Sequence, residues 1–518
     1  MLQLWTIALV GVMALYEALP GPTAPPVFSI WMLALSLAPF LVIMAMVRLV
    51  CRASVRALDA RGDVSAIAWA DRTVRLSQPL AVGAFAAAVL GLGLIGQLRA
   101  ILPGVPLLDY ALAILPPLSV FINNWAAMYP IERRLSDASM MRALDDAQAV
   151  YAPPTRGQYV LSRVRHELLL ILVPLVLIGV WSRGVDLAIG SAWMVRAWPG
   201  AGDPGTRSLV QSAAQMAGVV LVLALAPAVM RRVWDTVRLG EGALRDELLA
   251  MCRGAGVRVR EILVWRTHHV VVNAAAMGLV PRFRYILLTD GLLERLPRSQ
   301  LHAVMAHEIG HVKHRHIPWL IMGVVASGGL ITALAMLGLW GMDLALGTLV
   351  PGFASTEHAP PAWRSLWLGA SNIAAAVLGL GAALGIFGCI SRRFEWQADA
   401  FAAQRLSVEG GADVVTSAAA GAMQGALQTV AELGHVPTGR FSFRHGSILT
   451  RQRRLQRLVG TSVQRAPIDQ TSGRIKVATA LGLAVVVAMS VLDALVLRSD
   501  EAEPRSTIAQ PAAVEHHS

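Results

Sequence analysis

The sequence predicts a mainly α-helical, polytopic membrane protein with about nine spans and a small α+β domain. Of its 518 residues, 55% are hydrophobic and 15% are charged, and the mean hydropathy is +0.56. A soluble chain of this size would carry about 25% charged residues. Several apolar stretches are also long enough to cross about 30 Å of hydrocarbon, which takes about 20 helical residues.

The apolar runs divide the chain into membrane and polar segments. The predicted spans cover residues 3–19, 28–47, 79–101, 105–126, 167–182, 208–230, 317–340, 366–390 and 475–497. The first run has no basic region or small-residue cleavage site, so it is predicted to be a retained span. The resulting regions are a membrane region at 1–230, polar segments at 231–316 and 391–474, two spans within 317–390, a last span at 475–497 and a disordered tail at 498–518.

Arginine supplies nearly all of the net charge of +12, and its distribution predicts an orientation. The loops after the second and fourth spans are rich in arginine, whereas the alternate loops carry few. Because arginine-rich loops stay on the cytoplasmic side, the N-terminus and both polar segments are predicted to be cytoplasmic and the tail external. The positive charge therefore indicates a lipid bilayer partner and no nucleic acid.

The first polar segment is predicted to contain a small sheet. It opens with an amphipathic helix over 231–257 and continues with strand-like runs at 261–267, 268–276 and 284–290. A helix is then predicted from near Pro297 to about His316. The second polar segment is predicted to be mainly helical, with a break at 434–447 where glycine, proline and serine gather.

The sequence HEIGH in the first polar segment has the spacing of a metal site. In a helix, His307 and His311 share one face and can bind one ion. Glu308 lies beside them, where its carboxylate can take a proton from an attacking water. Two neutral imidazoles suit zinc. The alternative is an exposed helix whose histidines fall at this spacing by chance.

A second pair of residues supplies the third metal ligand that HEIGH lacks. A catalytic zinc site uses three protein ligands and leaves one position open. In EWQAD, Glu395 and Asp399 are four residues apart on one helical face. Glu395 is the predicted third ligand, and Asp399 is predicted to accept the second ring N–H of a ligand histidine. The alternative is a solvated, charged helix face.

The order HEIGH, two spans and EWQAD resembles the integral membrane gluzincins, which comprise the type-I CAAX prenyl proteases and the HtpX-like quality-control proteases. The resemblance covers about 232–458. The segment 273–293 looks like the family's edge strand and the segment after it, with Asn273 and Gly278. RHGSILTRQRRL looks like its His-Pro-x-x-x-x-Arg element, which gives His445 and Arg451, although Gly446 stands where the family has proline.

The resemblance implies a zinc metalloendopeptidase with one Zn²⁺ per chain and polypeptide substrates that are membrane-associated or misfolded. Asn273 would belong to an edge strand that holds the peptide extended, or it would simply end a strand. His445 and Arg451 would donate to the oxyanion, or Arg451 would only pair with a carboxylate such as that of Asp399. We expect the protein in the inner (cell) membrane of a bacterium. The sequence leaves prenylated substrates and the oligomeric state open.

Other classes of protein fit less well. Intramembrane proteases of the site-two type bury H-E-x-x-H in an apolar span, whereas ERLPRSQ and KHRH flank it here. Sensor peptidases resembling the antirepressor-type antibiotic receptors carry an external domain, and a tail of about 20 residues is too short for one. The remaining alternative is a non-proteolytic membrane scaffold or folding factor that retains a zinc site, for which Glu308 would have no use.

The other polar and sulfur-containing residues receive weaker interpretations. His314 and His316 are predicted to lie on a solvated basic end, and His268 and His269 have no predicted role. Cys51, Cys252 and Cys389 indicate buried small residues without a disulfide framework or a Cys-based zinc site. The asparagines in or near spans, Asn123, Asn124 and Asn372, either line a cavity or, as we favour, bond one helix to another.

Overall fold

The structure is a computed structural model of the chain. It describes residues 2–18, 28–102, 108–145, 152–197, 204–267, 271–349, 362–434 and 436–502. Residues 498–502 of the predicted disordered tail are helical, and its remaining residues, His268, His269 and the side chain of Asn372 lie outside the described residues.

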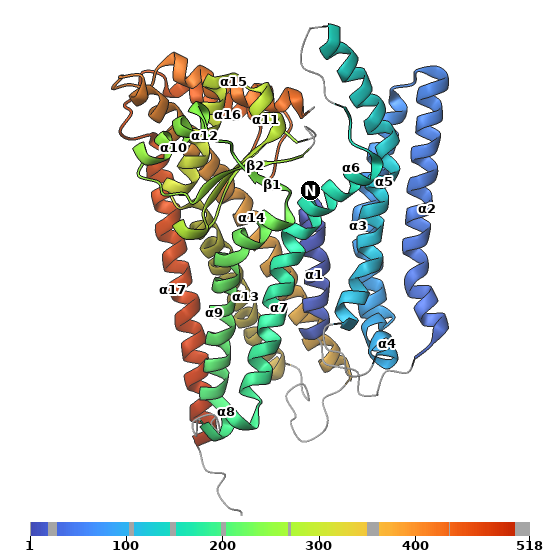
Figure 1. Cartoon of the computed structure of the whole chain (residues 1–518). Helices are drawn as coiled ribbons and strands as arrows, with labels where there is room; N and C mark the ends of the chain where they lie inside the picture. The colour runs from blue at the N-terminus through green and yellow to red at the C-terminus, as the bar shows by residue number, and fades with distance from the viewer. Residues whose placement is uncertain are drawn as a thin grey trace, which may run out of the picture.

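Helices of membrane-spanning length dominate the structure, as the sequence predicts (Figure 1). Among the described residues, eight helices are long and apolar enough to cross a membrane. They are α2 (Ile30–Arg61), α3 (Ser65–Ala86, extended by a π turn to Gly91), α5 (Leu108–Asp145), α6 and α7 (Arg156–Arg163 and Leu169–Ile189, joined by a π turn), α9 (Pro204–Val233), α13 (His316–Leu349), α14 (Ala362–Glu409) and α17 (Pro467–Ala502). The first predicted span corresponds to α1 (Leu2–Ala18), whose apolar part is shorter. Two short helices, α4 (Leu94–Ile101) and α8 (Ala192–Ala197), lie between spans.

Several predicted spans are shorter than the helices that contain them, and two of the differences affect the architecture. The third span was predicted at 79–101, but α3 begins at Ser65 and the helix ends at Gly91. Its first turns carry charged residues that hydropathy alone excludes. The eighth was predicted to end at 390, but α14 continues to Glu409. Because no glycine or proline lies between 391 and 409, the span runs without a break into the helix that carries Glu395.

The predicted small sheet is present and has four strands. Their order is β1 (Thr236–Arg238), β2 (Glu261–Trp265), β4 (Tyr285–Thr289) and β3 (Ala274–Met277). β2 and β4 are parallel, and both outer pairings are antiparallel. β4 is buried along its whole length. β3 therefore lies at one edge of the sheet, with one side paired to β4.

The continuous amphipathic helix predicted over 231–257 is wrong. α9 ends at Val233, β1 follows, and α10 covers only Ala243–Gly254. The segment between them contains Thr236 and Val237, whose branched side chains favour a strand. Gly240 and Gly242 then interrupt helical structure before α10 begins. Of the predicted strand over 268–276, residues 268–270 lie outside the described residues, and β3 covers Ala274–Met277.

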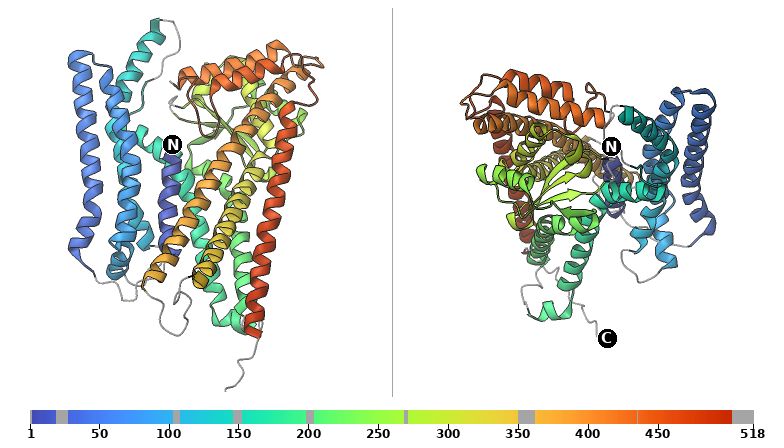
Figure 2. Two further views of the ribbon diagram at one scale, coloured as in Figure 1. Left: turned by 180° about the vertical axis from the view of Figure 1, so that it is seen from behind. Right: turned by 45° about the horizontal axis from the view of Figure 1, so that its top comes forward.

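The sheet and its helices form one end of the molecule, which we call the polar domain (residues 234–315 and 391–466). It contains α10, α11 (Asp290–Arg295), α12 (Arg298–Lys313), α15 (Ser417–Leu433) and α16 (Ile448–Leu458), together with the end of α14. Figures 1 and 2 show that α7, α9, α13, α14 and α17 extend from this end, while α2, α3 and α5 stand to one side. A core of apolar residues from α10, the sheet, α12 and α15 holds the domain together.

Candidate active site

Helix α12 carries HEIGH through the centre of the polar domain. Its residues from Ala303 to Gly310 are all buried, and it packs against α14, α15 and β3. Gly310 permits the close approach of α14, because a Cβ there would lie 3.1 Å from Phe401 and 3.2 Å from the Cα of Ala398. This contact brings the two predicted metal-binding segments together, although 84 residues separate Glu395 from His311.

His307, His311 and Glu395 form a cluster of possible metal ligands. One ligand atom from each lies within 4.8 Å of the others. The Nε2 atoms of the two histidines are 3.1 Å apart, and each lies 3.6 Å from a carboxylate oxygen of Glu395. Two imidazole nitrogens and a carboxylate are an ordinary donor set for zinc. The residues present therefore fit the metal that the sequence predicts.

Asp399 and Arg451 form a buried pair behind the cluster. Asp399 Oδ1 lies 3.0 Å from the Nδ1 of His307. Because an ionised carboxylate only accepts hydrogen bonds, this contact favours a proton on Nδ1 and leaves Nε2 free to bind a metal. Arg451 donates to both oxygens of Asp399, at 2.8 and 2.7 Å, and lies 3.4 Å from Glu395. Of the two interpretations of Arg451, the structure contains the carboxylate pairing.

Glu308 contacts the edge strand. Its Oε2 accepts a hydrogen bond from the backbone N–H of Ala276 at 2.7 Å. In the same strand segment, the backbone N–H and C=O of Asn273 bond to Thr289, on the β4 side. Because successive residues of a strand point their backbone groups to opposite sides, Ala274 and Ala276 present theirs to the free edge. Asn273 itself is exposed at the start of that edge.

Burial and neighbouring charges shift the pKa values of the HEIGH side chains in different directions. Burial lowers the pKa of His311 to about 3, which keeps its imidazole neutral. Burial also acts to lower the pKa of His307, but the carboxylates of Asp399 and Glu395 outweigh it and raise that pKa. Burial raises the pKa of Glu308 above its usual range. A carboxyl group with a raised pKa suits a residue that must both take up and release a proton.

His445 approaches the cluster from the loop before α16. Its Nδ1 lies 3.0 Å from Glu395 Oε1, and about half of its side chain is exposed. Gly446 bonds through its backbone N–H and C=O to Ser442, at 2.8 and 3.1 Å, and has a φ of +75°. Proline could neither adopt this φ nor donate that hydrogen bond. The departure from the family's proline therefore accompanies a different loop conformation beside His445.

One set of residues beside the cluster was not predicted from the sequence. His316, predicted to be solvated, is 2% exposed and its Nδ1 lies 2.9 Å from the Nδ1 of His311. The structure therefore contradicts the predicted solvated basic end at this residue. Gln397 and Asp469 continue the contacts from His316. The position of His316, five residues after His311, was the one sign of this contact in the sequence. The contact itself forms only because the chain turns between α12 and α13.

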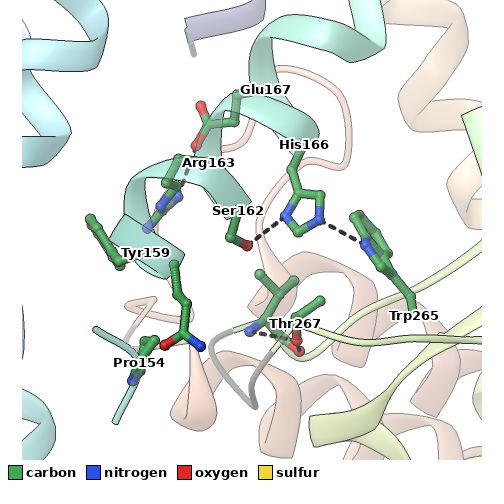
Figure 3. Close-up of a pocket in the computed structure, with 10 residues that line it drawn as sticks. Pro154, Tyr159, Ser162, Arg163, His166, Glu167, Trp265 and Thr267 are labelled. Atoms are coloured by element: carbon green, nitrogen blue, oxygen red, sulfur yellow. Dashed lines mark hydrogen bonds and ion pairs between the residues drawn. The ribbon is translucent and has the colours of Figure 1, made fainter. Parts of the chain in front are cut away.

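A separate pocket lies where the polar domain meets α6 (Figure 3). Its volume is about 180 Å³, and its lining comes from residues 154–167, from Trp265 and from the segment after β2. Trp265 Nε1 donates to His166 Nε2 at 2.7 Å, and His166 Nδ1 lies 3.2 Å from Ser162 Oγ. Trp265 also stacks on Trp234. These contacts join the N-terminal helices to the sheet, away from the metal ligands.

The fold and the cluster define a class, an integral membrane protein whose polar domain has a candidate metal site. The family comparison then identifies that domain. Residues 239–459 match the model of peptidase family M48. The resemblance predicted from HEIGH and EWQAD is therefore confirmed.

Curated relatives agree with the family over parts of their length. A "Protease HtpX homolog" of Desulfatibacillum aliphaticivorans is 36% identical over 134 residues, which are 26% of this chain and 39% of that protein. One from Thermococcus sibiricus is 34% identical over 171 residues, 32% of this chain and 54% of that protein. The solved structure "Crystal Structure of S. mikatae Ste24p" covers 87% of this chain and 99% of its own, with 15% identity and a TM-score of 0.41. The chain thus matches about half or less of the length of these curated relatives.

Proposed function

We propose that the chain is a zinc metalloendopeptidase that hydrolyses peptide bonds of membrane-associated or misfolded polypeptides. The observation that carries the proposal is the convergence of His307, His311 and Glu395, with Glu308 beside them, in a domain of a peptidase family. A non-proteolytic scaffold would need neither a complete ligand set nor a carboxylate next to it.

His307, His311 and Glu395 would hold one zinc ion. When bound, zinc would polarise the scissile carbonyl and lower the pKa of water to about 7. Glu308 then takes a proton from the attacking water and delivers it to the leaving amine. The raised pKa of Glu308 supports the second half of this role, because a more basic carboxylate holds the proton until it is needed. Proton transfer of this kind contributes roughly 10²–10⁴-fold to a rate.

The free edge of β3 would bind the substrate. Ala274 offers a main-chain donor and acceptor there and Ala276 offers its carbonyl oxygen, while the N–H of Ala276 already donates to Glu308. An extended peptide that adds to this edge is held mainly by its backbone. Such binding tolerates many side chains, which suits an enzyme that acts on misfolded chains. Asn273, at the exposed start of the edge, would bind the same peptide.

His445 would stabilise the oxyanion that forms on the scissile carbonyl. It is half-exposed beside Glu395, so its ring can reach a substrate bound at the cluster. Arg451 is buried and bonded to Asp399, and its charge lies 3.4 Å from Glu395. Its proposed role is to hold both carboxylates in place and to add positive charge beside the reaction.

We further propose that the polar domain lies in the cytoplasm of a bacterial cell. The α2–α3 connection and the end of α5, near the arginine-rich segments, lie at the same end of the molecule as the polar domain (Figure 1). Arginine-rich ends of spans remain cytoplasmic. Cysteine-labelling of whole cells at position 241 and at the opposite end near α8 tests this orientation.

The function is tested with purified full-length protein and an unfolded membrane-protein substrate. Glu308→Gln is expected to keep zinc and lose proteolysis by at least 10²-fold. His307→Ala is expected to lose both, because one of three ligands is gone. Glu241→Gln, at an exposed glutamate of the same domain, is the matched control. Unchanged cleavage by Glu308→Gln contradicts the assignment of the base, and zinc without turnover in the wild type supports the scaffold.

The substrate class is tested in cells. Membrane peptides from cells that carry the wild type and from cells that carry Glu308→Gln are compared by mass spectrometry. Fragments from many membrane proteins would support quality control. Fragments confined to the C-termini of prenylated proteins would instead support CAAX processing.

A further inference from the structure

His316 lies against a metal ligand because the chain turns sharply between two helices. α12 ends at Lys313 and α13 begins at His316. Between them, Arg315 has a φ of +54°, which makes it the one non-glycine residue with a positive φ in the described chain. Non-glycine residues rarely adopt this conformation, and its strain often accompanies a function. The turn directs His316 back to His311, so that their Nδ1 atoms lie 2.9 Å apart.

The contacts continue from His316 through two further helices. His316 Nε2 lies 3.0 Å from Gln397 Oε1, on α14. Gln397 Nε2 donates to Asp469 Oδ1 at 2.7 Å, in the first turn of α17. The other oxygen of Asp469 accepts from the backbone N–H of Ala466 at 2.9 Å. His316 and Gln397 are 2% and 4% exposed, so water does not compete for the contact between them.

The carboxylate at the end of this chain fixes the direction of every hydrogen bond in it. Ionised Asp469 can only accept, so Gln397 must present its NH₂ group to Asp469 and its oxygen to His316. His316 then carries its proton on Nε2, and its neutral ring has a lone pair on Nδ1. His311 must therefore donate from Nδ1. Its own lone pair lies on Nε2, the atom that faces His307 and Glu395.

The ring of His316 is also held in its plane. It stacks on Phe394 with ring centroids 4.4 Å apart and an interplanar angle of 6°, and it stacks on His314 at 5.7 Å and 16°. The ring cannot easily turn to exchange its two nitrogens. Packing and hydrogen bonding thus favour the same arrangement.

We propose that His316, Gln397 and Asp469 are positioning residues that fix the tautomer and orientation of His311 for metal binding. This inference rests on the metal site of the proposed function but not on proteolysis. His307 has a carboxylate partner directly, in Asp399. His311 is connected to a carboxylate, that of Asp469, only through the side chains of His316 and Gln397. The last helix, α17, thereby contributes to a metal site formed on α12 and α14.

The first test removes the acceptor at position 316 and keeps the packing. His316→Phe retains an aromatic ring that can stack on Phe394. We expect the zinc affinity of the purified protein, measured by chelator competition, to fall about 10–100-fold, as is typical when a ligand histidine loses its partner. The Tm of the metal-free protein should stay close to that of the wild type. His302→Phe, on the same helix as His311 but in contact with Glu247 and outside these contacts, is the matched control.

The second test exchanges the amide of Gln397 and the carboxylate of Asp469. In Asp469→Asn, the new NH₂ group can turn Gln397 and reverse the chain, which would put the proton of His311 on Nε2. We expect a drop of about 10-fold in zinc affinity. In the double variant Gln397→Glu with Asp469→Asn, the carboxylate at position 397 accepts hydrogen bonds from His316 and from the amide at position 469. The original direction returns, and zinc affinity should recover to within a few-fold of the wild type.

The outcomes separate this inference from the proposed function. A loss of zinc affinity in Asp469→Asn, together with its recovery in the double variant, supports the proposed positioning of His311, even if the wild type cleaves nothing. Unchanged zinc affinity in His316→Phe overturns it, even if the wild type is an active protease. A double variant that binds zinc no better than Asp469→Asn also overturns it. A ¹⁵N spectrum of the metal-free protein, with His311 assigned by substitution, should show the proton on Nδ1 in the wild type and on Nε2 in Asp469→Asn.

Discussion

Buried polar side chains serve different purposes in the polar domain and in the N-terminal helices. In the polar domain, side chains from α12, α14 and α16 converge on His307, His311 and Glu395. In the N-terminal helices they form local pairs that join neighbouring spans. Asn124 donates to Ser77 at 2.8 Å, and Arg48 donates to Asn123 at 2.5 Å.

The number of converging groups distinguishes buried polar residues that form a candidate site from those that only join two helices. A buried polar group is tolerated when it has a partner, and one partner is enough to join two helices. Asn123 and Asn124 therefore match the helix-to-helix bonding that we favoured from the sequence. Convergence of several charged groups is costly and needs a further reason. The cluster in the polar domain has such a reason if it binds a metal.

The largest effect on stability is expected at Arg451. Arg451→Met leaves the buried carboxylates of Asp399 and Glu395 without their cation, and removing one partner of a buried pair costs about 3–5 kcal/mol. The free energy of unfolding is measured by denaturant titration in detergent. Arg453→Met, at an exposed arginine of the same helix, is the control. Equal stability of the two variants would mean that the buried charges do not depend on each other.

A backbone substitution at Gly278 tests how tightly the polar domain is packed. Gly278 has a φ of +108°, and a Cβ there would lie 2.2 Å from the carbonyl oxygen of Phe283. Gly278→Ala should lower the free energy of unfolding by about 1–3 kcal/mol. Gly240→Ala, where no atom lies within 4 Å of the new Cβ, should have a much smaller effect. Similar effects at both positions would contradict the strained turn before β4.

The hydrogen bond between Trp265 and His166, which joins the two regions, should contribute less to stability than the buried contacts inside the polar domain. Trp265→Phe keeps the ring stacked near Trp234 but removes the hydrogen bond to His166. A typical hydrogen bond contributes about 1 kcal/mol. The expected result is a small decrease in Tm and faster proteolytic cleavage between the regions. Trp31→Phe, at a largely exposed tryptophan, is the control, and equal cleavage rates would show that this bond does not hold the junction.

The smallest effect is expected within the N-terminal helices. Ser77→Ala removes one bond between α3 and α5, and such bonds between membrane helices average about 0.6 kcal/mol. Zinc content and proteolysis should not change. A loss of activity without a loss of stability would place these helices in the reaction and remove the contrast between the two regions.

The sequence predicted the residues of the candidate site better than their connections. His307, His311 and Glu395 follow from residue type and helical spacing, and the structure brings them together. The partners of His311 do not follow in this way. His316 reaches it only because of the turn at Arg315, and Gln397 and Asp469 come from other helices. Contacts of this kind depend on packing between distant segments, which spacing along the chain does not encode.

The fold was predicted to a similar degree. Hydropathy located the spans, but it missed the polar first turns of α3 and the continuation of α14 into the polar domain. Both segments are helical by propensity while lacking an apolar run. Cys51 and Cys252 are buried as expected, but Cys389 is exposed on α14, where a membrane-facing surface is apolar as well. Burial inside the protein and burial in lipid give the same sequence pattern.

The most direct measurement is a zinc-loaded structure with the ion located by anomalous scattering. We predict one ion within about 2.0–2.2 Å of the Nε2 atoms of His307 and His311 and of a carboxylate oxygen of Glu395. The Nδ1 atoms of these histidines should stay bonded to Asp399 and His316. An ion held elsewhere, or a Glu395 carboxylate turned away with no replacement, would contradict the proposed hydrolytic site.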